Sequence, residues 1–320
     1  MTKRILALTF LALALPSLNA FSQQEGSMPT QTVISLDSKT PATATAKDVT
    51  LKVDNRVTPL LNLAQVPPNG AQIALLIDDG LRTSIGGDLN NIRSFITSFP
   101  AGTEVFVGFM QNGRVVPASD NNPGFSTDRA AVAQAVRLPI GLRGASASPY
   151  FCLSDFVKNW PPSAEGQSRQ SQQPAHKARF VLMITNGVDP YNGSTRITNQ
   201  DSPYVAAAVT DAQRAGVPVY SIYYSDAGFR GGRGSFSGQS YLEQVAQGTG
   251  GEAYYQGIGS PVSLAPFLKQ FQNAVAESYV ATFPAEGNKK MVSLKLSTSL
   301  PKTKVNAANQ VRPGTIVLSQ

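Results

Sequence analysis

Residues 71–77 form the sequence feature that most limits how this chain can fold. The segment, AQIALLI, is almost entirely apolar and is followed directly by aspartate. Such a strand is typical of a parallel sheet whose two faces are both covered. After it, apolar residues recur at spacings of three and four from Ile85 to Phe99, which predicts a helix with one buried stripe.

The alternation of strand and helix continues to residue 277. Further strands are predicted at residues 103–110, 180–184 and 217–224, with an edge strand near residues 114–119, and helices occupy the intervals. This order predicts an α/β fold with a doubly wound, mostly parallel sheet and helices on both faces. Ligand sites in such sheets lie at the carboxyl ends of the strands. Asp78, Asp79 and Asn186 fall there.

The first 20 residues have the pattern of a signal peptide. Lys3 and Arg4 precede an apolar run, and small residues lead to a cleavage point after Ala20. The apolar run is shorter than the ~20 residues of a bilayer span. A buried N-terminal helix is the alternative to a signal peptide. We expect export, to the medium or the periplasm, and no transmembrane segment after cleavage.

The segments outside residues 71–277 contain no predicted helix. Residues 21–45, rich in Ser, Thr, Gln and Pro, are predicted to be a flexible lead. Residues 46–70 and 278–320 contain alternating apolar positions, such as Val49 and Leu51 in the first and Leu294 in the second. We expect these two β segments to pack together as a small accessory element.

The formal net charge is +7, and much of it lies near the C-terminus. Basic residues from position 285 onward are Lys289, Lys290, Lys295, Lys302, Lys304 and Arg312, against Glu286 alone. This tail lacks the aromatic residues on which single-stranded nucleic acids stack. We therefore expect no nucleic-acid partner, and weak contact with anionic surface polymers stays open.

The residue types for catalysis are scarce. His176 is the only histidine and lies in residues 161–177, a polar stretch expected to be a solvated loop. Cys152 is the only cysteine and is expected to be a small buried residue. The glycine-rich residues 228–238 lack the ending of a phosphate loop and are expected to be a mobile loop. We expect neither an enzyme nor a bound cofactor.

Several segments together resemble a von Willebrand factor A domain. They include AQIALLIDDGLRTS (residues 71–84), GASASPYFCLSDFV (144–157) and ARFVLMITNGVDP (178–190). With the flanking segments, the chain is similar to secreted A-domain-related proteins common in acidobacteria. The resemblance implies the A-domain fold and adhesion-type binding, with magnesium held by the loops Asp-x-Ser-x-Ser and Thr-Asp-Gly.

The metal ligands of that family are altered in this chain. Gly80 and Arg82 occupy the two serine positions, and Asn186 replaces the second aspartate. Arg82 held ~5 Å from a dication would be repelled by roughly 7 kcal/mol at an effective dielectric of ~20. We therefore expect Arg82 to take the place of the cation, paired with Asp78 or Asp79, and no metal to be bound.

The resulting hypothesis is a secreted, non-enzymatic protein that binds a protein or envelope macromolecule without a metal. Its partner-binding rim is predicted to comprise Asp78, Asp79, Arg82, Ser84, Ser146, Ser148, Asn186 and Asp189. Three alternatives stay open. In the first, the chain is a structural component of the cell envelope that uses its β segments. In the second, it keeps magnesium through Ser146, Ser148 and Asp189. In the third, the rim residues only tie loops together.

Overall fold

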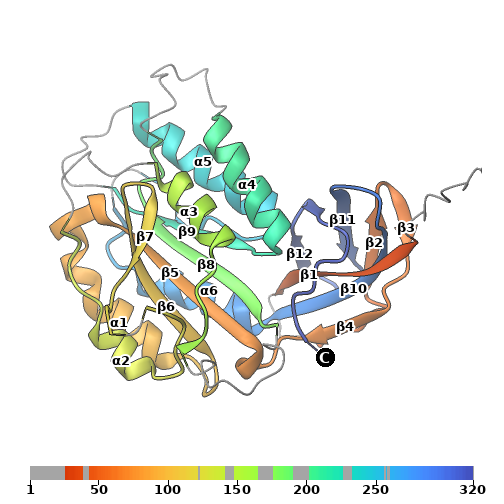
Figure 1. Ribbon diagram of the computed structural model, residues 1–320, viewed down its shortest axis with the longest axis horizontal. Helices are drawn as coiled ribbons and strands as arrows, with labels where there is room; N and C mark the ends of the chain where they lie inside the picture. Colours follow the sequence, from red (N-terminus) through yellow and green to blue (C-terminus); the bar gives the residue numbers. More distant parts are fainter. Residues whose placement is uncertain are drawn as a thin grey trace, which may run out of the picture.

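The chain folds into an α/β part and a β part that lie side by side (Figure 1). The computed structural model describes residues 26–38, 43–121, 123–140, 148–164, 176–189, 202–225, 233–255, 257 and 260–319, without the side chains of residues 82–84 and 233–236. The predicted signal peptide, residues 1–20, lies outside the described residues. No helix within the described residues has the length and apolarity needed to cross a bilayer.

A five-stranded sheet forms the centre of the α/β part. Its order is β7-β6-β5-β8-β9, and every pairing is parallel except that of β7, the antiparallel edge strand. All eight residues of β5 are buried, as the apolar run predicts. The strands are β5 Ala71–Asp78, β6 Glu104–Gln111, β7 Arg114–Pro117, β8 Ala178–Thr185 and β9 Val219–Tyr223.

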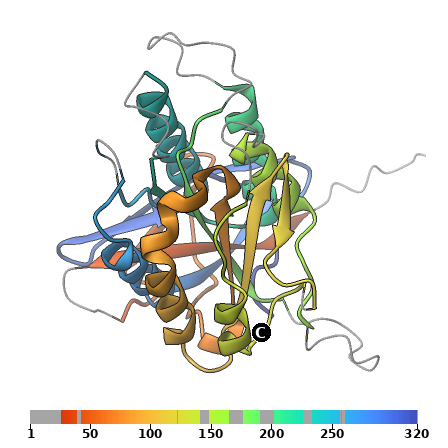
Figure 2. The same ribbon diagram turned by 90° about the vertical axis from the view of Figure 1, so that its left-hand side faces the viewer.

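Helices cover both faces of this sheet (Figure 1 and Figure 2). Alternate residues of β5 enter separate cores, Ile73 with α1 and α6 on one face and Ala74 with α3, α4 and α5 on the other. The helices are α1 Leu89–Ser98, α2 Arg129–Gln134, α3 Pro149–Lys158, α4 Pro203–Ala215, α5 Arg233–Thr249 and α6 Ala265–Ala276. The predicted fold class, a doubly wound and mostly parallel α/β sheet, is confirmed.

The β part consists of two four-stranded sheets. One has the order β12-β1-β10-β4 and the other β13-β11-β2-β3. The strands are β1 Ser27–Ser38, β2 Val49–Val53, β3 Arg56–Thr58, β4 Asn62–Gln65, β10 Ser278–Glu286, β11 Val292–Thr298, β12 Thr303–Ala307 and β13 Gln310–Val311. Strand β2 pairs with β11 and β4 pairs with β10, so the two segments that flank the α/β part lie together.

The prediction that residues 21–45 form a flexible N-terminal segment is wrong for the residues of β1. This strand lies between β12 and β10, and its residues from Thr30 to Leu36 are all buried. The polar composition concealed a run of β-branched residues, TVI at positions 32–34, that suits a buried strand. Val33 and its partner Val280 also enter a core of the α/β part, so these strands join the two parts.

Two loop predictions also need correction. Helix α5 begins at Arg233, so the predicted mobile loop at residues 228–238 is helical in its second half. The polar stretch at residues 161–177 is structured at both ends, because Ser163 pairs with Phe125 and Lys177 forms an ion pair with Glu104. At residues 161–177 the local polar composition hid contacts with residues far away in sequence.

Replacing Ile34 with alanine tests the structural role of β1. Ile34 is fully buried in the core of the β part, so Ile34→Ala is expected to lower the free energy of unfolding by about 2–5 kcal/mol. Val57→Ala, at a site 71% exposed on β3, serves as control and is expected to cost less than about 0.5 kcal/mol. Urea unfolding of residues 21–320 measures both, and equal costs would contradict the placement of β1.

Candidate functional site

Two neighbouring strands, β5 and β8, end at the carboxyl end of the sheet, where the resemblance predicts a site. Strand β5 ends at Asp78 and β8 ends at Thr185, and the parallel register pairs Ile77 with Ile184 just before these ends. The register therefore brings the two polar side chains together, although they are more than one hundred residues apart in sequence.

Both carboxylate oxygens of Asp78 accept hydrogen bonds. Its Oδ2 atom accepts a hydrogen bond of 2.6 Å from the Thr185 hydroxyl, and its Oδ1 atom accepts one of 2.9 Å from the Gly80 amide. Asp78 is 4% exposed. The Gly80 contact makes Asp78 the cap of the 3₁₀ helix Asp79–Asp88 that follows β5. The carboxylate thus fixes both the neighbouring strand end and its own loop.

Asp79 is engaged elsewhere. Its Oδ1 atom accepts a hydrogen bond of 3.0 Å from the amide of Ile140, and the residue is 3% exposed. Asp79 is the first residue of the 3₁₀ helix after β5, and this contact is with Ile140 and not with the partners of Asp78. Asp79 ties the segment before residue 140 to this edge of the sheet.

The loop after β8 is held by its own side chains. The Thr185 hydroxyl also accepts from the amide of Gly187, and Asn186 Oδ1 accepts from the amide of Val188 at 2.9 Å. Gly187 has a φ of +67°, and a Cβ atom there would lie 2.5 Å from the carbonyl oxygen of Gly238. The Thr-Asn-Gly sequence therefore makes a tight turn against α5.

Tyr150 on α3 completes the contact network. Its hydroxyl donates a 2.7 Å hydrogen bond to the carbonyl of Gly187. Burial, and secondly the nearby Asp189, raises the pKa of Tyr150 well above its ordinary value, so the phenol remains a donor. The sequence prediction missed both Thr185 and Tyr150. The signal for Thr185 was its position at the end of an apolar run beside Asn186.

The predicted rim residues that the structure describes are mostly buried. Ser148 is fully buried and caps α3 through the amide of Tyr150, while Asp189 is 7% exposed and accepts from the Ser202 hydroxyl at 2.7 Å. Only Asn186 is partly exposed. The side chains of Arg82 and Ser84, and the whole of Ser146, lie outside the described residues. The described members thus act as ties between loops, which the sequence left open as one alternative.

Cys152 and His176, the two candidate reactive side chains, lie in different places in the fold. Cys152 is fully buried on α3, and burial together with Asp78 raises the pKa of its thiol to about 12, which confirms the expectation of a small buried residue. His176 precedes β8, at the end of the sheet opposite Asp78, and its backbone bonds to Ser319. Within the described residues, no three His, Cys, Asp or Glu side chains converge as metal ligands would.

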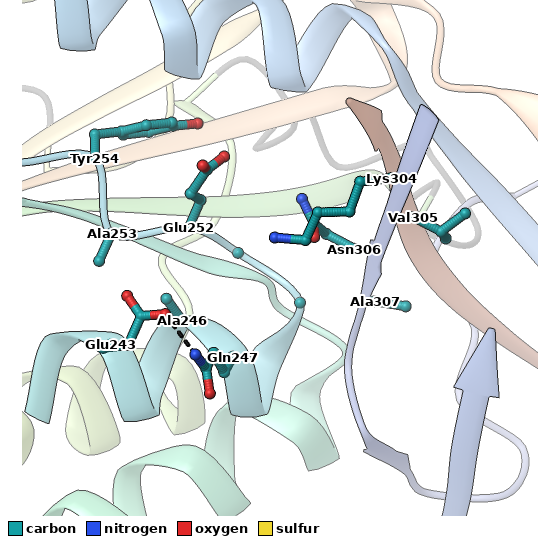
Figure 3. A pocket seen from close by; sticks show the side chains of 12 residues that line it. Glu243, Ala246, Gln247, Glu252, Ala253, Tyr254, Lys304, Val305, Asn306 and Ala307 are labelled. Carbon is teal, nitrogen blue, oxygen red and sulfur yellow. Dashed lines mark hydrogen bonds between the residues drawn. The ribbon is translucent and has the colours of Figure 1, made fainter. Parts of the chain in front are cut away.

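A groove of about 810 Å³ lies between the two parts of the molecule. Glu243 on α5 and Glu252 line one side, and Lys304 and Asn306 on β12 line the other. Figure 3 shows the Lys304 side chain reaching from β12 toward Glu252. Burial, followed by Asp37 on β1, raises the pKa of Glu252, and Glu243 adds to the effect while Lys304 opposes it.

Solved structures with a distant likeness to this chain include von Willebrand A proteins. The von Willebrand factor type A protein from Catenulispora acidiphila is 12% identical over 91% of this chain and 75% of its own, with a TM-score of 0.37. The ArnB paralog VWA2 from Sulfolobus acidocaldarius is 11% identical over 88% of this chain and 76% of its own, with a TM-score of 0.35.

A third solved structure is the pilus adhesin SpaC from Lactobacillus rhamnosus GG, in its open conformation. It is 9% identical over 86% of this chain, with a TM-score of 0.36, and this chain spans 47% of the adhesin. No protein-family model and no curated protein sequence matches the chain. The likenesses concern the course of the backbone alone.

Replacing Thr185 tests the tie between the two strand ends. Thr185→Val keeps the shape but leaves Asp78 Oδ2 and the Gly187 amide without this partner, and is expected to lower the free energy of unfolding by about 1–3 kcal/mol. Thr185→Ser keeps the hydroxyl and is the matched control, expected to cost less. Thermal and urea unfolding measure both, and equal costs for the two variants would show that the hydroxyl contributes nothing.

Two carboxyl groups affected by Asp37, those of Glu252 and Glu277, predict a pH dependence of stability. The pKa values of Glu252 and Glu277 are raised by burial and by Asp37, so the folded protein binds protons more readily than the unfolded chain. The ionised forms of these two glutamates therefore lower the free energy of unfolding at pH 7. This loss of stability is relieved as the pH falls toward the ordinary glutamate pKa of about 4.5. Glu252→Gln is expected to raise stability at pH 7 and to flatten its rise on acidification.

The control for this prediction is Glu286→Gln, because Glu286 lies at the end of β10 with an exposed side chain. Urea unfolding midpoints of the three proteins between pH 7 and pH 4.5 decide the outcome. Parallel pH profiles for Glu252→Gln and the unsubstituted chain would contradict the role of Glu252.

Proposed function

We propose that this chain is a secreted, non-enzymatic protein of the von Willebrand A type that binds a protein or envelope macromolecule without a metal. The partner contacts the loops at the carboxyl end of the central sheet. The observation that supports this most is the engagement of Asp78, whose two oxygens accept from Thr185 and Gly80.

The described residues at this edge do not fit a magnesium ion. Magnesium requires near-octahedral oxygen ligands. Gly80 supplies no side-chain oxygen, the Thr185 hydroxyl donates to Asp78, and Asn186 Oδ1 accepts from the amide of Val188. A cation here would have to break hydrogen bonds that hold the loops in place.

Binding then depends on the shape and polarity of the loop surface. The buried carboxylates Asp78, Asp79 and Asp189 hold the loops in place through their hydrogen bonds. Loops on a rigid sheet are the usual location of binding residues. Arg82 remains the predicted cation substitute and a predicted contact residue, on the strength of its sequence position alone.

A second candidate function is a structural or assembly role in the cell envelope through the β part. Strands β3 and β4 are consecutive in sequence and are edge strands of the two β sheets. Val57 and Leu61, on and beside them, are 71% and 61% exposed. An exposed strand edge with aliphatic side chains is a surface on which another strand can pair, which favours this candidate.

Binding by the loops should be indifferent to a chelator. Residues 21–320 are used to capture a partner from envelope extracts with and without chelator, and the affinity is then measured at two salt concentrations. Arg82→Ala is expected to weaken binding by ~1–3 kcal/mol, the scale of a charged hydrogen bond. Lys302→Gln and Lys304→Gln, control variants in the basic tail, are expected to change mainly the salt dependence.

Other outcomes distinguish the alternatives. Loss of binding on chelation would restore a magnesium-dependent site. Binding that survives Arg82→Ala but is lost on Val57→Lys or Leu61→Lys would place the interface on the edge of the β part and support the envelope role. Turnover of a captured substrate would contradict the non-enzymatic assignment.

A further inference from the structure

A second groove lies at the opposite end of the central sheet, where the C-terminal segment passes the start of β8. It has a volume of about 420 Å³. Five of its lining residues are basic types and none is acidic: His176, Lys177, Arg179, Arg214 and Arg312. In Figure 1 the C-terminal segment, dark blue, runs down the junction between the two parts to its marked end. The groove therefore concentrates positive charge at this junction.

Two of these cations have nearby carboxylates. Lys177 lies 2.7 Å from Glu104, and that carboxylate also accepts from Gln72 and Ser163. Arg214 lies 3.8 Å from Asp211, which Lys158 also approaches at 3.4 Å. Their charges are partly balanced within the protein.

Arg179 and Arg312 are different. Within the described residues, neither guanidinium has an ion pair or a hydrogen bond. Arg179 is only partly exposed, and burial lowers its pKa. A guanidinium carries five N–H donors in a fixed planar fork, so its burial without acceptors is unfavourable unless a ligand or solvent supplies them. Arg312 is exposed on the C-terminal segment that lines the same groove.

The position of Arg179 is supported by rigid neighbours. Its guanidinium carbon lies 5.0 Å from the centre of the Trp160 ring. The indole N–H of Trp160 donates to Gln72 at 2.8 Å, and the ring stacks on Phe125 at 5.0 Å. A cation held over a fixed aromatic ring keeps its N–H edges available to a ligand.

The other wall of the groove is fixed as well. The Gln31 side chain accepts hydrogen bonds from the amides of Val317 and Leu318, and the amide of Gly314 donates to Thr30. At the end of α4, the carbonyls of Ala212 and Gln213 accept from the amides of Val217 and Gly216. The groove thus has fixed walls and unpaired donors.

We propose that this groove binds the oxyanion group of a small ligand, with Arg179 and Arg312 as its principal contacts. Phosphate, sulfate and carboxylate share the required chemistry, because each offers the acceptor oxygens that an arginine fork binds in two contacts. The site is independent of the proposed partner-binding loops. Strand β8, Ala178–Thr185, separates them by ~23 Å at about 3.3 Å per residue.

The single tryptophan of the chain provides the measurement. Residues 21–320 are titrated with inorganic phosphate, sulfate and acetate at constant ionic strength, and the fluorescence of Trp160 is followed beside calorimetry. A ligand that engages Arg179 is expected to change this emission saturably. A response to phosphate and sulfate alone would indicate a tetrahedral anion, and a response to acetate a carboxylate.

Three variants test the assignment. Arg312→Gln, at an exposed site, is expected to weaken binding about tenfold without affecting folding. Arg179→Lys keeps the charge but removes the fork, and is expected to weaken binding by a similar factor. Lys290→Gln, an exposed cation at the far end of the β part, is the control with equal loss of charge and should bind as the unsubstituted chain does.

Two results would overturn the proposal. One is the absence of saturable binding by calorimetry for all three anions. The other is an equal loss for Lys290→Gln and Arg312→Gln, which would reduce the effect to general electrostatic attraction. Neither result bears on the partner-binding loops, because Arg82 and chelation test those separately.

Discussion

The burial of β5 on both faces is the constraint on which the other features of the structure depend. Its alternate residues enter two separate cores, so helices cover each face, and the neighbouring strands β6 and β8 run parallel to it. Parallel pairing with β8 in turn places Asp78 beside Thr185 at one end of the sheet. The same pairing places Arg179 and the Glu104 network at the other end.

At the carboxyl end of the sheet, the described acidic side chains hold the loops through hydrogen bonds. A buried carboxylate is costly unless it is hydrogen-bonded, and Asp78, Asp79 and Asp189 each have a donor within 3.0 Å. In the family that the sequence resembles, similar positions hold a metal. Here the Thr185 hydroxyl and backbone amides donate hydrogen bonds to Asp78 and Asp79 and hold the loops.

The β part is joined to the α/β part by more than a linker. Val33 and Val280 extend into a core of the α/β part, and the C-terminal segment is bound to β1 by Gln31. Carboxylates gather along one side of the junction at Glu252 and Asp37, and basic groups gather around Arg179. Acidic groups, with Lys304 beside them, therefore lie on one side of the junction and basic groups on the other.

The sequence by itself determined the order of strands and helices in residues 71–277, because the apolar periodicity of each element depends only on which faces are buried. It also located the loops at Asp78 and Asn186, since these follow directly on apolar strands. It did not reveal β1, because the threonines and glutamine of residues 30–32 are buried only through pairing with β10 and contacts with the C-terminal segment. Nor did it show that Asp78 is bonded to Thr185 or that Arg179 and Arg312 line the same groove. Those contacts join residues distant in sequence, and only the tertiary structure decides which donor reaches which acceptor.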